Sequence, residues 1–181
     1  AHTLWKRKLE QRLALPSSMG GRYAKQVVFV PSMPSRDFQR LVGAHGMVML
    51  DPFPFGGGVT SLEGLGLCTP IVTWPQRQTT LRFTAGFYRL MDQRYRQRQQ
   101  PADGAAQADD GVVSLVDALV ASSHEDYVRE AVRLAPGSAW RAAVGRRVCE
   151  TAEVLFEDGR SVRELERLLL RLVRARSAPG Q

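Results

Sequence analysis

The residues best suited to chemistry lie in a glycine-rich segment near the middle of the chain. The three glycines Gly56–Gly58 follow the apolar run Met47–Leu50, which has the length of a buried strand. Glycine allows positive φ and lets the backbone approach a ligand closely. A helix should follow, capped by Thr60 or Ser61 and running to about Leu67. The segment therefore predicts a strand, a loop and a helix in direct succession.

The start of that predicted helix offers a site for an anion. Free amide N–H groups and the helix dipole favour a phosphate at a helix N-terminus. Glu63 lies in the first turn, where its carboxylate can accept hydrogen bonds from a ribose. The loop also follows the carboxyl end of a strand, where open α/β sheets bind ligands. A plain tight turn is the alternative interpretation of a triple glycine.

Prolines separate the elements around the loop. Asp51 ends the first strand, and Pro52 and Pro54 stop its hydrogen-bond ladder because proline has no N–H to donate. Pro70 ends the helix, and Ile71–Thr73 begins a second buried strand. The order of these elements indicates an α/β fold.

These motifs resemble the donor-binding half of two-lobed (GT-B type) glycosyltransferases, above all the O-linked GlcNAc transferases and their bacterial tetratricopeptide-linked relatives. The matching motifs are Asp51-Pro52-Phe53-Pro54, Gly56-Gly57-Gly58, Thr60-Ser61-Leu62-Glu63 and Pro70-Ile71-Val72-Thr73. The resemblance implies that Gly57, Gly58, Val59 and Thr60 hold the diphosphate of a nucleotide-sugar donor and that Ser61 belongs to the same binding site. It also implies that Glu63 binds the ribose.

Four positions depart from that family. Gly58-Val59 replaces a His-Thr pair of the animal enzymes, which removes an imidazole and a hydroxyl from the implied phosphate site. Glu63 replaces an aspartate and has a longer reach to the ribose. Cys68 replaces the glycine that closes the helix. Because a side chain makes positive φ costly, we expect the helix to end differently here.

The resemblance implies roles for residues outside the loop. Arg36 and Phe38 would form a wall of the base pocket, with core packing as the alternative for Phe38. Arg82 would stabilise charge on the diphosphate as the glycosidic bond breaks, the alternative being a surface arginine packed on Trp74. His45 is interpreted as a partner of a helix C-terminus rather than a base. A general base is expected on the other lobe, and the sequence has no metal-ligand spacing.

Charge and composition narrow the class of ligand. The 181 residues carry a net charge of +7 with a pI near 10.1, and 44% are hydrophobic. Most basic residues are arginines spread over several helices, without the aromatic interleaving of an RNA-binding surface. We therefore expect an anionic small ligand and no nucleic acid. No apolar run approaches the ~20 residues of a membrane span, so no membrane partner is expected.

The two cysteines, Cys68 and Cys149, lie far apart in the sequence. This pattern favours buried thiols in a reducing compartment over a disulfide scaffold. We therefore expect a cytoplasmic or nuclear protein. The chain starts with an amphipathic helix and has neither an initiator methionine nor a signal peptide, which indicates an internal fragment.

The predicted fold class is a Rossmann-like parallel sheet flanked by helices, incomplete at its N-terminal side, with a helical C-terminal segment. The continuous apolar run Val27–Val30 predicts a further strand covered on both faces. We expect an α/β nucleotide-sugar-binding core over 1–91 and a low-complexity mobile insert over 92–111. A helical part of the same domain should cover 112–176, and a disordered tail 177–181.

Several helices carry further signals. A first helix from Ala1 to about Ala14 has an apolar stripe that we expect to pack against a sheet, the alternative being a basic face that binds a membrane surface. The predicted caps are Ser35, Ser138 and the capping boxes Ser122/Glu125 and Ser161/Glu164. The last of these helices places valine and leucine side chains on one face.

We predict the donor-nucleotide-binding lobe of a glycosyltransferase that moves GlcNAc from UDP-GlcNAc to a protein Ser/Thr hydroxyl. The reaction would invert the anomeric centre and need no metal or cofactor beyond the UDP-sugar donor. An upstream catalytic lobe and tetratricopeptide repeats of the same parent chain would complete the enzyme. The alternatives are a small-molecule glycosyltransferase or nucleotide-sugar epimerase on the same fold, and a non-catalytic scaffold lobe.

Overall fold

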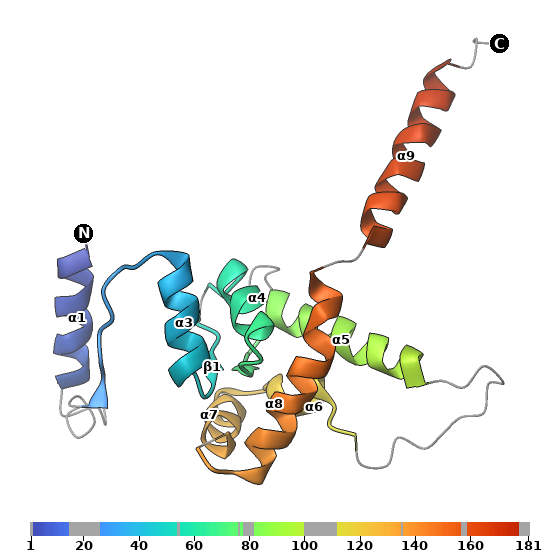
Figure 1. The fold of residues 1–181 in the computed structure, drawn as a ribbon. Helices are drawn as coiled ribbons and strands as arrows, with labels where there is room; N and C mark the ends of the chain where they lie inside the picture. The colour runs from blue at the N-terminus through green and yellow to red at the C-terminus, as the bar shows by residue number, and fades with distance from the viewer. Residues whose placement is uncertain are drawn as a thin grey trace. The chain divides into compact units, whose positions relative to one another are not determined.

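The computed structural model places the elements in two compact units, residues Ala1–Ser35 and Arg36–Gln181. It describes residues 2–14, 26–53, 55–75, 77, 82–99, 112–134, 136–156 and 159–177. The first unit contains helix α1 (His2–Ala14) and an irregular segment that leads to the next helix (Figure 1).

The elements after that segment follow in the order drawn in Figure 1. They are α3 (Ser35–His45), β1 (Met49–Leu50), α4 (Val59–Gly66), β2 (Ile71–Val72), α5 (Phe83–Gln99), α6 (Leu115–Leu119), α7 (His124–Arg133), α8 (Ala139–Thr151), the 3-10 helix η3 (Ala152–Leu155) and α9 (Gly159–Ser177). Helices therefore dominate the part of the chain that the structure describes.

The sheet is short and parallel. Met49 pairs with Ile71 and Leu50 with Val72. A parallel bridge then joins Thr73 to Val120, so the segment after α6 extends the pairing at the other edge of β2. The predicted parallel α/β arrangement is thus confirmed in part, with a sheet of two strands among the described residues.

Two expectations for the N-terminal unit are wrong. Val27–Val30 is not a strand, and Val28 is 81% exposed. A strand is stabilised by a hydrogen-bonded neighbour, and none of the described strands pairs with this run. The apolar stripe of α1 is not core either, because Leu4 and Leu9 are both close to half exposed.

A tyrosine hydroxyl completes the hydrogen bonding of β2. Tyr88 of α5 donates to the carbonyl oxygen of Ile71 over 2.8 Å and accepts from its N–H over 2.9 Å. Tyr88 is fully buried, and this burial raises the pKa of its phenol. Since buried main-chain polar groups need partners, the hydroxyl takes the place that a neighbouring strand would otherwise fill at Ile71.

The core lies where α4, α5, α6 and α8 meet the short sheet (Figure 1). Its buried members are Leu65, Ile71, Val72, Tyr88, Met91, Leu115, Ala118, Leu119, Leu134, Val144, Val148 and Ala152. Gly64 lets α4 approach the sheet closely, because a Cβ at this position would collide with the sulfur of Met49.

A buried carboxylate joins α5, α6 and α8. Asp92 accepts the main-chain N–H groups of Leu115 and Val116 over 3.1 and 3.0 Å. Arg147 lies 3.5 Å from the same carboxylate, and its guanidinium stacks 3.3 Å above the ring of Tyr95. The mobile insert predicted from residue 92 is therefore wrong as far as residue 99, because α5 continues through it. Residues 100–111 lie outside the described residues.

The structure confirms one predicted cap, moves a second by one residue and starts the last helix before its predicted cap. Ser138 caps α8 as expected, accepting from the N–H of Arg141. The cap of α7 is Ser123 rather than Ser122, and it accepts from the N–H of Asp126. Helix α9 already begins at Gly159, so Ser161 lies inside it and does not cap it.

The end of α4 corrects two expectations about Cys68. The helix closes as it would with glycine: the N–H of Cys68 bonds the carbonyl of Leu65, and the N–H of Thr69 bonds that of Gly64. Cys68 takes φ of +61°, a conformation that costs roughly 1–2 kcal/mol for a residue with a side chain. It forms a disulfide with Cys149, so the two cysteines are not buried free thiols.

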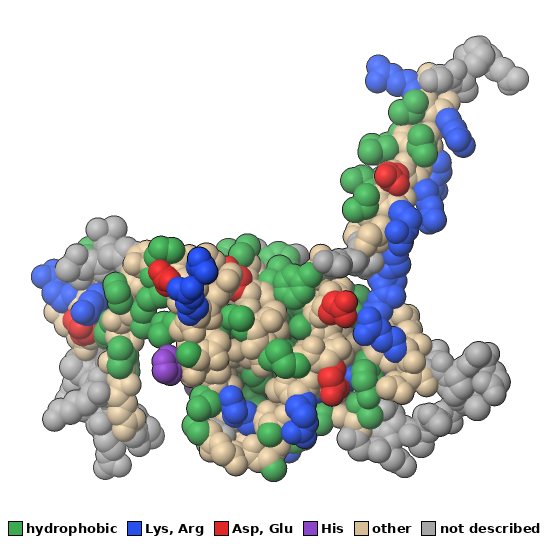
Figure 2. Space-filling model, in the orientation of Figure 1, with side chains coloured by type: hydrophobic (Ala, Val, Ile, Leu, Met, Phe, Trp, Pro, Cys, Tyr) green, Lys and Arg blue, Asp and Glu red, His purple; other side chains and the backbone are tan. Residues whose placement is uncertain are grey.

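Helix α9 is strongly amphipathic. Figure 2 shows its apolar side chains on one side of the helix and its arginines on the other. The apolar residues include Val162, Leu165, Leu169 and Leu172, each about half exposed or more. None of the described helices has the length and apolar character needed to cross a membrane.

We expect Tyr88→Phe to lower the free energy of unfolding by about 1–3 kcal/mol, because the N–H and carbonyl of Ile71 lose their buried partner. Urea denaturation measures this change. The matched control is Tyr95→Phe, which keeps the ring beneath Arg147 and should cost less than about 0.5 kcal/mol. Equal losses in the two variants would contradict the role given to the Tyr88 hydroxyl.

Candidate functional site

The site is organised by the carboxylate of Asp51, the residue that follows β1. Its Oδ1 accepts the N–H of Gly57 over 2.6 Å, and its Oδ2 accepts the hydroxyl of Thr73 over 2.7 Å. Only 8% of Asp51 is exposed. Because Thr73 directly follows β2, this one side chain connects the carboxyl ends of both strands to the glycine loop.

The main chain at Asp51 is also held in place. The hydroxyl of Tyr127 on α7 donates to the Asp51 carbonyl oxygen over 3.0 Å. Burial, and to a smaller degree the charge of the Asp51 carboxylate, raises the pKa of Tyr127. The phenol therefore stays a proton donor at neutral pH, and α7 is tied to the start of the loop.

Helix α4 begins with amide groups that no side chain caps. Gly58 is its N-cap residue and makes no side-chain hydrogen bond, so the predicted capping by Thr60 or Ser61 is wrong. Both residues lie in the first turn instead. The first N–H groups of a helix have no partner within it, which leaves the amides from Val59 to Ser61 available to an anion.

Side chains around the first turn of α4 come from neighbouring helices. The buried hydroxyl of Ser61 accepts from the Thr84 hydroxyl of α5 over 3.3 Å. Glu63 is half-buried and accepts from the Gln39 side-chain amide of α3 over 3.0 Å. The start of α5 and the middle of α3 thus lie beside α4. Glu63 is the fifth residue of α4, so the prediction that it lies in the first turn is wrong.

The remaining predicted site residues lie around that first turn. Arg82 is exposed and stands just before α5, two residues from Thr84. Arg36 is exposed and Phe38 half-buried, both on the helix that reaches Glu63 through Gln39. These residues therefore lie on elements next to α4. The glycine loop, in contrast, leads directly into the start of α4.

A group of aromatic side chains at the same edge was not recognised in the sequence. Trp74 follows Thr73, and its ring lies 5.7 Å from that of Phe53 and 5.9 Å from that of His124. Phe53 is 61% exposed. The position of Phe53 and Trp74 just beyond two predicted strands was the available signal. His124 comes from the start of α7, which only the tertiary structure brings here.

The described residues give no support for a metal centre. No group of three or more His, Cys, Asp or Glu side chains able to hold a metal ion occurs among them. Main-chain amides at the start of a helix are suited to binding an anion, and the start of α4 has such amides without a side-chain cap.

Comparisons with known proteins give a fold match. No protein-family model and no curated protein matches the sequence. Among solved structures, the fold matches a mutant O-GlcNAc transferase from Thermobaculum terrenum, with a TM-score of 0.65 and 22% sequence identity. The match covers 90% of this chain and 27% of that one. The chain therefore has the fold of part of a GT-B glycosyltransferase, as its motifs predicted, and spans about a quarter of that protein's length.

We expect adjacent glycines to differ in their tolerance of a side chain. A Cβ on Gly57 would collide with the Ser61 hydroxyl, whereas a Cβ on Gly58 would meet nothing within 4 Å. Gly57→Ala should therefore lower the free energy of unfolding by about 1–3 kcal/mol in urea denaturation. Gly58→Ala is the matched control and should leave it almost unchanged. The opposite order would show that the loop is packed differently.

Proposed function

We propose that this chain is the donor-binding lobe of a glycosyltransferase and that the loop before α4 holds the diphosphate of a nucleotide sugar. The observation that carries the proposal is the Asp51 carboxylate. It fixes the glycine loop at the carboxyl ends of two parallel strands, in front of an uncapped helix start. The glycosyltransferase-like fold supports the same reading of this loop.

The donor is bound chiefly by main-chain groups. The positive end of the α4 dipole faces the diphosphate. It offers the phosphate oxygens the N–H groups of Gly58, Val59, Thr60 and Ser61. Glu63 accepts hydrogen bonds from the ribose hydroxyls, and Gln39 orients its carboxylate. The nucleobase lies against Arg36 and Phe38 of α3. Because Gly58 has no imidazole, the amides carry more of the phosphate binding than they do in the animal O-GlcNAc transferases.

Catalysis requires more than this lobe. Arg82 at the start of α5 offsets the charge that develops on the leaving diphosphate. A base from an upstream lobe removes the proton of the acceptor hydroxyl, which attacks the anomeric carbon with inversion. GlcNAc from UDP-GlcNAc is the donor sugar, a protein Ser/Thr hydroxyl the acceptor, and no metal takes part. Tetratricopeptide repeats of the parent chain present the acceptor.

A non-catalytic scaffold lobe is the second candidate. Val59, the first residue of α4, is 73% exposed and has no hydroxyl to offer a phosphate. Gly58 has no side chain, so two successive positions at the start of the helix lack a polar side chain. A lobe that has lost donor binding would keep the fold and lose its affinity for nucleotides.

We expect the folded chain to bind UDP more tightly than GDP or ADP in calorimetric titrations. Glu63→Ala should weaken UDP binding by about 1–3 kcal/mol, or roughly tenfold to a hundredfold in Kd, because the ribose hydroxyls lose their acceptor. The matched control is Glu153→Ala on η3, an exposed acid that should leave Kd unchanged.

The nucleotide preference separates the candidates. A preference for GDP would keep the site and change the donor to a fucose- or mannose-type sugar. Failure of a folded chain to bind any of the three nucleotides would reject the donor site and support the scaffold lobe. Equal losses of UDP affinity in the Glu63 and Glu153 variants would show that Glu63 does not bind the ribose.

A further inference from the structure

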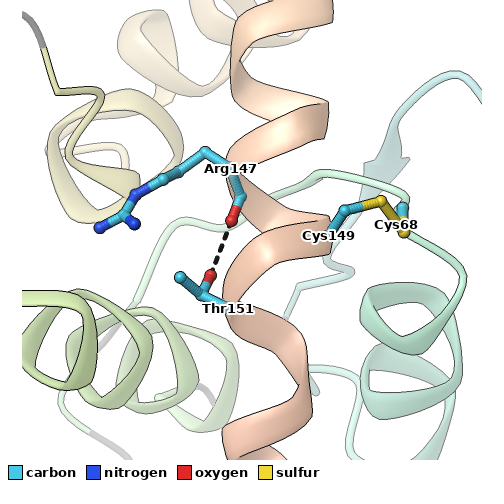
Figure 3. Close-up of a disulfide and its surroundings, with 4 residues drawn as sticks. All are labelled: Cys68, Arg147, Cys149 and Thr151. Atoms are coloured by element: carbon cyan, nitrogen blue, oxygen red, sulfur yellow. Dashed lines mark hydrogen bonds between the residues drawn. A yellow bond between two sulfur atoms is a disulfide. The ribbon is translucent and has the colours of Figure 1, made fainter. Parts of the chain in front are cut away.

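A disulfide ties the far end of α4 to α8, at the edge of the sheet opposite the glycine loop. Cys68 lies two residues after α4 and three residues before β2, while Cys149 projects from α8, and their Cα atoms are 4.7 Å apart (Figure 3). Arg147 projects from the opposite side of α8 and belongs to the buried ion pair with Asp92. Cys149 is exposed and Cys68 is partly exposed, so the bond is open to solvent on one side.

The disulfide lies in the wall of a surface hollow of about 420 Å³. Gly145 and Ala142 of α8 keep the hollow open because their side chains are small or absent. Its charged lining consists of Arg141, Arg146 and Glu150. The hollow has room for a small peptide-sized molecule beside the sulfur atoms, and its lining has two positive charges against one negative.

The two arginines are arranged to favour an anion near Cys149. Arg146 is exposed and lies three residues before Cys149, on the same face of the helix. Arg141 is fixed by its Nε, which donates to the carbonyl oxygen of Met47 over 3.2 Å. Positive side chains next to a disulfide raise the local concentration of a negatively charged thiolate and stabilise its adduct.

We propose that this hollow is a thiol–disulfide exchange site for small anionic thiols of the glutathione class. The thiolate sulfur of the small molecule attacks Cys149 Sγ, because that cysteine is the more exposed. A new S–S bond forms to Cys149, the Cys68–Cys149 bond breaks, and Cys68 leaves as a thiolate that takes a proton from water. The carboxylates of the bound thiol then lie against Arg146 and Arg141.

A second thiol completes the reduction. Its thiolate attacks the small molecule's sulfur in the mixed disulfide and releases Cys149 as a thiolate, which is protonated. Two electrons pass to the protein, two thiols form on it, and the small molecule leaves as its own disulfide. The opened chain loses a covalent tie between residues 81 positions apart, so its thermal midpoint should fall by several degrees.

The test compares an anionic with a neutral thiol on the oxidised full chain. Opening by reduced glutathione and by 2-mercaptoethanol is followed through alkylation of the released thiols and intact mass. The glutathione to 2-mercaptoethanol rate ratio should fall roughly threefold to tenfold in Arg146→Gln, because one attracting charge is lost. Arg163→Gln on α9 is the matched control and should keep the wild-type ratio.

Two further readouts decide the proposal. Peptide mapping should find the glutathione adduct on Cys149. A rate ratio that is unchanged in Arg146→Gln, or an adduct found mainly on Cys68, would overturn it. Because both thiols are measured on each variant, a general loosening of the fold would change both rates and leave the ratio intact.

Discussion

A single carboxylate determines how this lobe presents its glycine loop. Asp51 is nearly buried, and a buried carboxylate is tolerated only when donors surround it. The donors here are the Gly57 N–H and the Thr73 hydroxyl, which come from the loop and from the end of the neighbouring strand. The same contacts that satisfy the charge therefore align the loop with the sheet edge. The start of α4 comes next along the chain and has no side-chain cap, because its N-cap residue is Gly58.

Elsewhere in the chain, side chains also provide hydrogen-bond partners for buried polar groups. A sheet of two described strands leaves main-chain groups of β2 in the core, and the Tyr88 hydroxyl satisfies those of Ile71. Asp92 supplies acceptors for the N-terminus of α6 and pairs with Arg147. Each of these polar groups holds one element against another. In a larger sheet, further strands would pair with β1 and β2, whereas here α5 and α8 pack around the two strands.

Local signals in the sequence were sufficient for the central part of the fold. The apolar runs, prolines and glycines around residues 47–73 predicted the strand, loop, helix and strand, and their motifs predicted the glycosyltransferase-like fold. Features that depend on distant partners were missed. Asp92 looked like part of a polar insert because its partners lie 22 to 55 positions away. The Cys68–Cys149 pairing and the contact of His124 with Trp74 likewise exist only after folding.

The most direct test of the proposed donor site is an NMR titration of the ¹⁵N-labelled chain with UDP, made on the wild type and on Asp51→Ala. We predict that the largest amide shift changes fall on residues 57–61 and Glu63, and that the variant loses them while its core amides stay dispersed. Changes centred on another part of the chain, or equal responses of both proteins, would contradict a loop that Asp51 holds ready for the diphosphate.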